Sequence, residues 1–396
     1  MIPVKTISPP FWMSDARAVR LMKVLGGYKE NPESLFVGGC VRNTLLEKPA
    51  NDIDIATVHK PLDVIEKLKS AGIRFVPTGL DHGTITALVE DATYEITTLR
   101  KDIETDGRYA VIAFATDWID DAQRRDFTIN TLLAGPDGKI YDPTGQGLAD
   151  LEARRVVFVG TAGERIAEDY LRILRFFRFY AQYGSGSADE AALAACHTHA
   201  DKISSLSRER ITQEFLKILA VPQAASILSL MFSHNVLTDI VKDYDAPVME
   251  HFCNMQVQCE AVDVIARLSV LSTMSGNFFE DSLVLSNAQK KNLKLYCEAS
   301  RLLKTITKKK AREAAYRFGN AAALQGYFLR QSEKQEGPDF EIIDIARYWQ
   351  APEFPIKADD LISAGVVRGP DLGKKLTELE EKWIAKDFPS NFSFKK

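Results

Sequence analysis

The stretch that decides the fold reads FVGGCVRNTLL from Phe36 to Leu46 and, after a short gap, NDIDIAT from Asn51 to Thr57. The apolar residues at its start and end predict short strands, and the glycine pair between them predicts a turn into a helix. Alternate side chains of a strand share one face of the sheet. We therefore expect Asp52 and Asp54 to project together while the isoleucines beside them are buried.

This segment has the composition of a metal and phosphate site. Two carboxylates side by side repel each other unless a cation lies between them, and Mg²⁺ favours oxygen ligands that it shares with substrate phosphates. Gly38 and Gly39 let backbone amides approach a phosphate closely, and Arg42 adds positive charge in the first turn of the helix. A surface turn with two solvated aspartates is the alternative, but the coupling of Asp52 and Asp54 to the glycines and Arg42 favours the site.

A third carboxylate would complete a two-metal site, which holds the attacking and leaving oxygens in line. Glu95 is the candidate, because it lies in a strand-like run between Tyr94 and Ile96, whose side chains would point to the opposite face. Pairing of Glu95 with a Lys or Arg across the sheet is the alternative.

A basic motif reads RRDFTIN from Arg124 to Asn130. The two arginines precede a predicted helix start that Asp126 or Thr128 can cap. Guanidinium groups at this position could clamp a triphosphate, where charge must be neutralised during phosphoryl transfer. A structural salt-bridge cluster of Arg124 and Arg125 is an equal alternative.

A second arginine-rich segment predicts one helix from Ile166 to Tyr183. One face is apolar, and the other side carries Asp169, Arg172, Arg175 and Arg178. Residues three apart on a helix are neighbours. Because Asp169 offers acceptors and Arg172 offers donors, the pair can imitate a complementary base edge and select a nucleobase without a template. An intrahelical ion pair is the alternative. A following helix start at Ser207 is predicted to pair Glu214 with Arg210.

The organisation along the chain predicts an α+β fold. The 396 residues exceed what one hydrophobic core usually organises. Short β-type runs at 35–37, 53–55, 85–89, 94–99 and 111–114 alternate with helical stretches such as Leu62–Ser70, and after a last run at 156–159 helical patterns dominate, as at 208–219 and 222–232. We expect a head with a mixed sheet followed by a helical remainder.

Composition excludes little. The hydrophobic fraction of 45%, the charged fraction of 26% and the net charge of −4 are those of an ordinary globular protein. No signal peptide or membrane span is evident. Five cysteines without regular spacing suit a reducing cytoplasm. Cys196, His197 and His199 fall short of a four-ligand zinc pattern, and His234 and His251 have no neighbouring Asp that would indicate a hydrolase of the His-Asp type.

The charge is uneven along the chain. Between Lys290 and Arg317 stand ten Lys or Arg residues and two acids, a local net charge of +8. This predicts a surface that contacts phosphates. A solvated helix face balanced by acids elsewhere in the chain is the alternative.

Taken together, these segments resemble the class II tRNA nucleotidyltransferase and poly(A) polymerase family of the DNA polymerase β superfamily. The glycine pair with Arg42, Asp52 and Asp54 looks like its catalytic motif, and Arg124–Asn130 looks like its ribose and triphosphate motif. Glu168-Asp169-x-x-Arg172 looks like its amino-acid template, and Arg208–Ile211 is similar to its helix-stabilising motif. The resemblance covers about residues 30–220, and Asn43 departs from it, because the family usually has Asp there.

The resemblance implies a polymerase-β-like head over 1–153, a helical neck over 154–220, a body over 221–285 and a tRNA-binding tail over 286–396. It implies Mg²⁺ bound by Asp52 and Asp54, and the sequence around Glu95 adds that residue as an assisting catalytic carboxylate. The residues that it implies for ATP and CTP binding come from all three motifs: Gly38, Gly39, Arg42, Arg124, Arg125, Asp126, Asn130, Asp169, Arg172, Arg175 and Arg178.

The implied activity is addition of CCA to the 3′ end of tRNA, with release of pyrophosphate. The segment Arg100–Arg108 looks like a flexible loop that members adding only two cytidines tend to lack, which favours complete CCA synthesis. The chain lacks a long basic C-terminal extension of the kind seen in bacterial poly(A) polymerases. A poly(A) polymerase, an enzyme of partial CC- or A-adding activity and a non-catalytic RNA-binding module are the alternatives.

Overall fold

The computed structural model describes residues 1–106, 109–241, 243–275 and 279–394. Two compact units divide the chain. The first comprises residues 1–214 with 233–236, and the second comprises 215–232 with 237–396. The first unit holds the predicted head and most of the predicted neck, and the four-part division made from the sequence stays a prediction.

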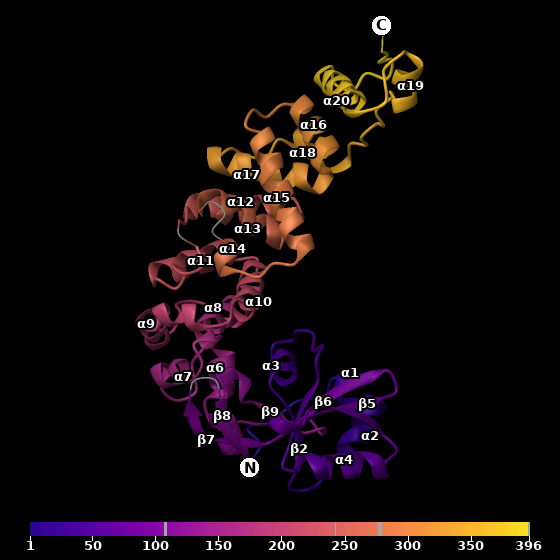
Figure 1. Ribbon diagram of the computed structural model, residues 1–396. Coiled ribbons are helices and arrows are strands. Elements are labelled where there is room, and N and C mark those ends of the chain that lie inside the picture. The colour runs from indigo at the N-terminus through magenta and orange to yellow at the C-terminus, as the bar shows by residue number, and fades with distance from the viewer. Residues whose placement is uncertain (107–108, 242, 276–278, 395–396) are drawn as a thin grey trace. The chain divides into compact units, whose positions relative to one another are not determined.

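A mixed sheet of eight strands forms the centre of the first unit, in the order β1-β10-β9-β2-β3-β6-β5-β4. Neighbouring strands are antiparallel except β3 and β6, which run parallel. In Figure 1 these strands lie in the indigo and purple part of the ribbon. Their bounds are Lys5–Thr6 (β1), Ser34–Val37 (β2), Asp54–Thr57 (β3), Arg74–Gly79 (β4), Thr84–Val89 (β5), Ala92–Thr98 (β6), Leu133–Ala134 (β9) and Lys139–Tyr141 (β10).

Alternation of side chains explains how the sheet is held. In β5, Ile85, Ala87 and Val89 are buried while the residues between them are half-exposed. A cluster of apolar side chains covers the centre of the sheet and contains Leu35, Val37, Ala56, Leu99, Ala115, Leu133 and Tyr141. The predicted strands at 35–37, 53–55, 85–89 and 94–99 correspond to β2, β3, β5 and β6, so the mixed α+β head is confirmed.

A separate two-stranded sheet stands in the chain between β6 and β9 of the main sheet. Arg100–Asp106 (β7) pairs antiparallel with Tyr109–Phe114 (β8). The segment Arg100–Arg108, which the sequence predicts to be a loop, is therefore mostly the first strand of a hairpin, and Gly107 and Arg108 lie outside the described residues. The hydrogen-bonded partners of this segment come from residues that follow it in the chain, which a local motif does not reveal.

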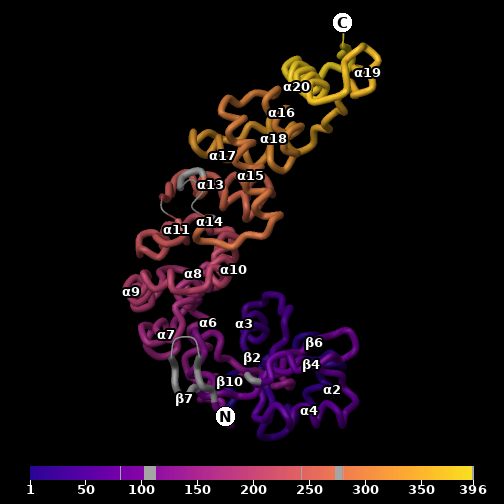
Figure 2. The backbone as a smooth tube through the Cα atoms, viewed as in Figure 1, coloured from indigo at the N-terminus to yellow at the C-terminus, as the bar shows by residue number. Residues whose placement is uncertain are grey.

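The rest of the first unit is helical. Figure 2 follows the chain from β10 into α6, α7 and α8. The helices of this unit are α1 (Phe11–Ser14), α2 (Ala16–Val24), α3 (Gly39–Leu45), α4 (Pro61–Ser70), α5 (Trp118–Gln123), α6 (Gly147–Glu152), α7 (Ala162–Glu168), α8 (Leu171–Tyr183), α9 (Glu190–Thr198) and most of α10 (Arg208–Leu219), with short 3₁₀ turns at Leu80–His82 (η1), Thr128–Asn130 (η2) and Ala200–Ser205 (η3).

Three predictions about this helical part are wrong. The helix predicted over 166–183 is two helices, because the extended backbone of Asp169 (φ −157°, ψ 104°) ends α7. The run at 156–159 forms only an isolated bridge between Phe158 and Phe127. The helix predicted after Arg125 is the single turn η2, which no side chain caps.

The second unit contains only helices among its described residues. They are α11 (Ala224–Ser233, whose last residue belongs to the first unit), α12 (Ala246–Gln258), α13 (Val264–Ser275), α14 (Phe279–Ser282), α15 (Asn287–Leu302), α16 (Lys308–Phe318), α17 (Asn320–Lys334), α18 (Phe340–Tyr348), α19 (Ala358–Ser363) and α20 (Pro370–Ala385). No helix in the described part of the chain is long and apolar enough to cross a membrane.

Acidic partners offset much of the positive charge predicted for residues 290–317. Arg312 pairs with Asp387, Arg317 pairs with Glu313 and Glu381, and Lys308 pairs with Glu341. By contrast, Lys290 and Lys291 at the start of α15 are exposed and form no ion pair with any described residue. Arg301, Lys304 and Lys309 also form no ion pair with a described residue, so unbalanced charge remains from α15 to the start of α16.

Candidate active site

Two of the three predicted carboxylates are partners in the sheet. Asp54 opens β3, and Glu95 stands directly beside it in the parallel strand β6. Asp52 lies in the bend before β3, so strand alternation does not place it, contrary to the prediction. Its charge nevertheless acts on Asp54. Asp54 and Glu95 therefore stand side by side where β3 begins, with Asp52 in the bend before them.

The environment of Asp54 makes its ionised form costly. Burial and the negative charges of Glu95 and Asp52 together raise the pKa of the Asp54 carboxyl to about 6, although the nearby positive charge of Arg125 opposes them. Like charges that crowd one another at a half-buried position are relieved when a cation binds between them.

The oxygen-only donor set of Asp52, Asp54 and Glu95 fits a hard divalent cation. Among the described residues, no group of three or more His, Cys, Asp or Glu side chains could by itself hold a metal ion. Mg²⁺ commonly takes one or two carboxylates and completes its shell with waters and substrate phosphates. The open arrangement at β3 fits that mode of binding.

The glycine turn leads from the sheet to the arginines. Gly38 follows β2 with a positive φ of 70°, and a Cβ atom there would lie 3.6 Å from Nη1 of Arg125. Glycine thus keeps open the space between the turn and this guanidinium. The positive charge of Arg125 also acts to lower the pKa of Asp54. The glycine turn, the Arg125 guanidinium and the carboxylates at β3 therefore belong to one site.

Asp121 holds both arginines of the basic motif, and sequence reasoning missed it. Its carboxylate is 4% exposed and accepts from Nε of Arg124 at 3.1 Å and from Nη2 of Arg125 at 2.8 Å. It also accepts from the backbone N–H of Arg100 at the start of β7, at 3.3 Å. Burial opposes ionisation, but the two guanidinium groups keep the pKa of Asp121 below its usual value. The sequence signal that could have revealed Asp121 is its position in α5, three residues before Arg124 and four before Arg125.

Asp126 joins the turn η2 to α8. It accepts from Nη2 of Arg175 at 2.5 Å and from Nδ2 of Asn130 at 2.9 Å. Burial raises the pKa of Asp126, but the Arg175 guanidinium outweighs it and the net pKa is lowered. Asp126 is thus an ion-pair partner rather than the predicted helix cap, and Thr128, the other predicted cap, donates to Asp150 instead.

Arg42 lies in α3 and is 6% exposed. Its guanidinium donates to Oδ1 of Asn43 at 2.9 Å, to Asn130 and to the hydroxyl of Tyr183 at 2.7 Å. Tyr183 ends α8, and sequence reasoning missed it, because its contact with Arg42 spans 141 residues.

The predicted pair of Asp169 and Arg172 does not form. Arg172 donates to Oε2 of Glu168 at 2.6 Å and to the backbone oxygen of Arg165 at 2.8 Å. Asp169 accepts from Nη2 of Arg210 at 2.7 Å. The break between α7 and α8 turns Asp169 away from helical geometry, so the three-residue spacing does not bring the two side chains together.

The predicted ion pair between Arg210 and Glu214 does not form either, because each of these residues pairs with a different partner. Glu214 accepts from Nε of Arg178 at 2.6 Å, while Arg210 is bound to Asp169. Both ion pairs cross between α10 and the α7–α8 region. They are tertiary contacts, which a spacing rule within one helix cannot predict.

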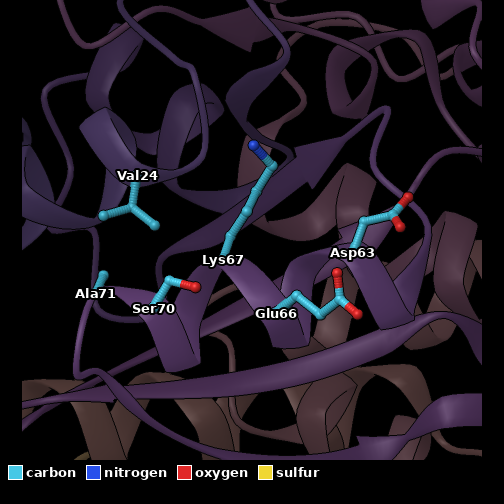
Figure 3. Close-up of a pocket in the computed structure, with 6 residues that line it drawn as sticks. All are labelled: Val24, Asp63, Glu66, Lys67, Ser70 and Ala71. Atoms are coloured by element: carbon cyan, nitrogen blue, oxygen red, sulfur yellow. The ribbon is translucent and has the colours of Figure 1, made fainter.

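Two surface pockets lie in this unit. One is lined by residues of α5, the 143–146 loop and α7, and Gln123, Thr128, Arg165 and Glu168 are among them. It borders the carboxylate that holds Arg172. The other lies along α4, where Figure 3 shows Asp63, Glu66 and Lys67 on one helix, and no predicted site residue lines it.

Comparisons with known proteins agree with this geometry. Residues 34–157 match the model of the poly A polymerase head domain, and residues 188–246 match that of a probable RNA and SrmB-binding site of polymerase A. The mitochondrial CCA tRNA nucleotidyltransferase 1 of Mus musculus is 34% identical over 365 residues, which cover 90% of this chain and 83% of that protein. The Homo sapiens protein of the same name is 34% identical over 376 residues with the same coverage.

Solved structures share the fold. The Bacillus stearothermophilus CCA-adding enzyme in complex with CTP superposes with a TM-score of 0.74 at 23% identity, covering 96% of this chain and 94% of that one. The Thermotoga maritima CCA-adding enzyme complexed with tRNA gives a TM-score of 0.69 at 18% identity, covering 100% and 97%. With the identity to the mouse and human proteins over most of their lengths, the chain belongs to the CCA tRNA nucleotidyltransferase family.

Proposed function

We propose that this protein adds CCA to the 3′ end of tRNA, using CTP and ATP and releasing pyrophosphate. The observation that carries the proposal is the pairing of Asp54 with Glu95 beside Arg125, in a chain whose mouse and human relatives are named CCA tRNA nucleotidyltransferases.

The acidic cluster would hold the metal. Asp52 and Asp54, assisted by Glu95, would bind Mg²⁺, which when bound lowers the pKa of the attacking hydroxyl and neutralises charge on the phosphates. Because burial and neighbouring charges raise the pKa of Asp54 to about 6, its carboxyl must lose a proton before it can serve as a ligand. At Mg²⁺ concentrations that do not saturate the site, activity should therefore fall as the pH drops through about 6.

The arginines would bind the nucleotide. Arg125, held by Asp121, and Arg42, held by its neutral neighbours, would contact the triphosphate beside the open turn at Gly38. The 3′-hydroxyl oxygen of the tRNA then attacks the α-phosphorus, and the bond to pyrophosphate breaks. Fixed cations at this place stabilise charge that develops on the leaving group.

The α7–α8 junction would select the base. Glu168 orients Arg172, and Arg210 orients Asp169, so each group is fixed by a partner outside the proposed template pair. Donors and acceptors held in this way can discriminate the Watson–Crick edges of cytosine and adenine. Arg175 and Arg178 lie further along α8. Their ion pairs with Asp126 and Glu214 would hold this helix in place next to the base-selecting residues.

The helical second unit would bind the tRNA. Its exposed Lys290 and Lys291 can contact backbone phosphates, which carry most of the affinity for duplex RNA. The reducing cytoplasm stays a prediction for the compartment, since the mouse and human relatives carry a mitochondrial name.

One incubation tests the proposal. The protein is mixed with tRNA lacking its terminal CCA, CTP, ATP and Mg²⁺, and the product ends are sequenced. We expect CCA and no further addition. Ends that stop at CC or that require a preformed CC would indicate partial activity. A long adenosine tract on both tRNA and unstructured RNA with ATP alone would indicate a poly(A) polymerase.

A further inference from the structure

Two basic side chains near the end of α8 have no acidic partner. Lys48 lies in the loop between α3 and β3, and Arg154 follows α6. Neither of them forms an ion pair with a described residue. The arginines already placed at the site differ from these two residues, because a carboxylate acts on each of them, as Asp126 does on Arg42.

The end of α8 brings Lys48 and Arg154 together. The ammonium of Lys48 donates to the backbone oxygen of Gln182 at 2.8 Å. The backbone N–H of Ser185 donates to the backbone oxygen of Arg154 at 3.0 Å. Burial and the charges of Arg154 and Arg42 lower the pKa of Lys48, so these three cations lie close enough to act on one another.

Shared contacts connect the cations of the nucleotide site. Arg125 and Arg42 both donate to Asn130, Arg125 to its backbone oxygen at 3.4 Å and Arg42 to its side-chain oxygen. The ring of Tyr183 connects Arg42 with Lys48, because its centroid lies 4.0 Å from Cζ of Arg42 and 4.8 Å from Nζ of Lys48. The cations therefore form one continuous series, in which Arg42 is a middle member.

This series leads away from the carboxylates at β3. The charge of Arg125 acts on Asp54. Lys48 instead responds to Arg42 and Arg154, and no carboxylate is among the charges that shift its pKa. A nucleotide whose α-phosphate lies at the metal would therefore extend its outer phosphates past Arg42 toward the unpaired cations. Charge-assisted hydrogen bonds from such cations are strong contacts for a phosphate.

Both unpaired side chains can contact a ligand. An ammonium has three donors, and Lys48 uses one of them for Gln182. Arg154 has a positive φ of 54° just after α6, where glycine is the favoured residue. An arginine at this position costs backbone free energy and gains no ion pair with the described part of the protein, which favours a role in binding an anion.

We propose that Lys48 and Arg154 extend the nucleotide site beyond Arg42, where they bind the terminal phosphate of the incoming nucleotide and then the leaving pyrophosphate. This inference rests on the proposed function, because pyrophosphate is released when the bond between the α-phosphorus and its bridging oxygen breaks. It adds two residues that lie outside the motifs of the family resemblance.

Binding of pyrophosphate tests the inference without the reaction. Isothermal titration calorimetry with pyrophosphate and Mg²⁺ should show about fivefold weaker binding to Lys48→Ala and to Arg154→Gly, and more than about tenfold weaker binding to the double variant. Lys48→Arg should keep most of the affinity, because it keeps the charge. Lys69→Ala is the matched control, since it removes an exposed cation from the last turn of α4 and should bind pyrophosphate as the wild type does.

Steady-state kinetics separates the phosphates of the nucleotide from those of RNA. In the double variant, KM for CTP and ATP should rise about fivefold and the inhibition constant of pyrophosphate about tenfold, while KM for tRNA changes less than about twofold. The rises should shrink at high salt, because exposed charges are screened. A higher KM for tRNA with unchanged pyrophosphate binding would mean that these cations bind RNA phosphates, and it would overturn the inference.

Thermal unfolding distinguishes binding from a structural role. Arg154→Gly should keep or raise the Tm, because glycine adopts a positive φ without strain. A cation near the C-terminus of a helix can also stabilise that helix. If Lys48→Ala lowers the Tm but leaves pyrophosphate binding unchanged, Lys48 only caps α8 and the inference is wrong. A wild-type protein that binds pyrophosphate through these two residues but adds no nucleotide would overturn the proposed function instead.

Discussion

The acidic end of β3 and the arginine-rich face of α8 both carry many charged side chains, but in the described part of the chain the charges are unpaired at β3 and paired on α8. Among the described residues, Asp52, Asp54 and Glu95 form no ion pair, and burial together with the charges of Glu95 and Asp52 raises the pKa of Asp54. The arginines of α8 each have a carboxylate: Arg172 has Glu168, Arg175 has Asp126 and Arg178 has Glu214. Unbalanced charge indicates where a ligand binds, and balanced charge indicates scaffold.

The largest effect should come from Asp54→Asn, which keeps the shape of the side chain but removes its charge. Incorporation with Mg²⁺ should fall about 10³-fold, as when a group that stabilises the transition state is lost, and Asp52→Ala should behave alike. The fold should be as stable as before, because a repelled charge is gone. Single-turnover CTP incorporation measures the loss, with Asp63→Asn on α4 as the control. A rate near that of the wild type would contradict the metal role.

Asp126→Ala should have the opposite signature, because it breaks a balanced pair. It leaves the half-buried Arg175 without its carboxylate, so the free energy of unfolding should drop by about 3 kcal/mol. Urea denaturation followed by circular dichroism measures the loss. Glu152→Ala, which breaks an exposed pair with Lys5, should cost less than about 1 kcal/mol. Equal losses in the two variants would remove the contrast between paired and unpaired charge.

The pH dependence of stability tests the crowding at Asp54 directly. Its pKa is raised from 3.8 to about 6 in the folded protein, so the folded state binds more protons than the unfolded state between these values. The free energy of unfolding of the metal-free protein should therefore decrease as the pH rises from about 4 to about 6, by about 2 kcal/mol from this group. Asp54→Asn should lack that decrease, which Tm measurements in EDTA would show. Parallel curves for the two proteins would contradict the account.

Arg172→Ala tests whether one of the paired arginines also reads the base. If Arg172 reads the base, its loss should alter the ratio of CTP to ATP incorporation about tenfold, more than it slows either addition. Glu168→Gln, which removes the carboxylate that Arg172 shares with Arg165, should shift the ratio in the same direction by a smaller factor. Sequencing of ends formed with both nucleotides measures the choice. An unchanged ratio of CTP to ATP incorporation would mean that Arg172 has only a structural role.

The smallest effect is expected in the second unit. Replacing the unpaired Lys290 and Lys291 together by Ala should raise KM for tRNA about threefold and lessen its dependence on salt. Lys308→Ala, at a cation paired with Glu341, should change KM less. Steady-state assays at two salt concentrations compare them. If Lys308→Ala raised KM for tRNA more than the double variant does, the presence of an ion pair would not distinguish structural lysines from tRNA-binding lysines in this unit.

The sequence predicts well what depends on neighbouring residues and poorly what depends on tertiary contacts. The turn at Gly38 and the strands β2, β3 and β6 follow from short-range patterns of glycine and alternating apolar residues. The break at Asp169 does not, because a spacing rule assumes that a helical backbone continues.

The same limit applies to partners. Asp121 could have been found from its spacing to Arg124 and Arg125, which follow it by three and four residues just after the end of α5. Tyr183 could not, because its contact with Arg42 depends on how α8 packs against α3. The arginines were visible in the sequence, but the balance of their charges required the structure.

The most direct test is a carboxyl-carbon NMR titration of Asp54 with and without Mg²⁺. Crowded, unpaired carboxylates predict a pKa of about 6 without metal, and a value below 3.8 once Mg²⁺ binds. A pKa near 3.8 that does not respond to Mg²⁺ would contradict the claim that this end of the sheet is arranged for a cation.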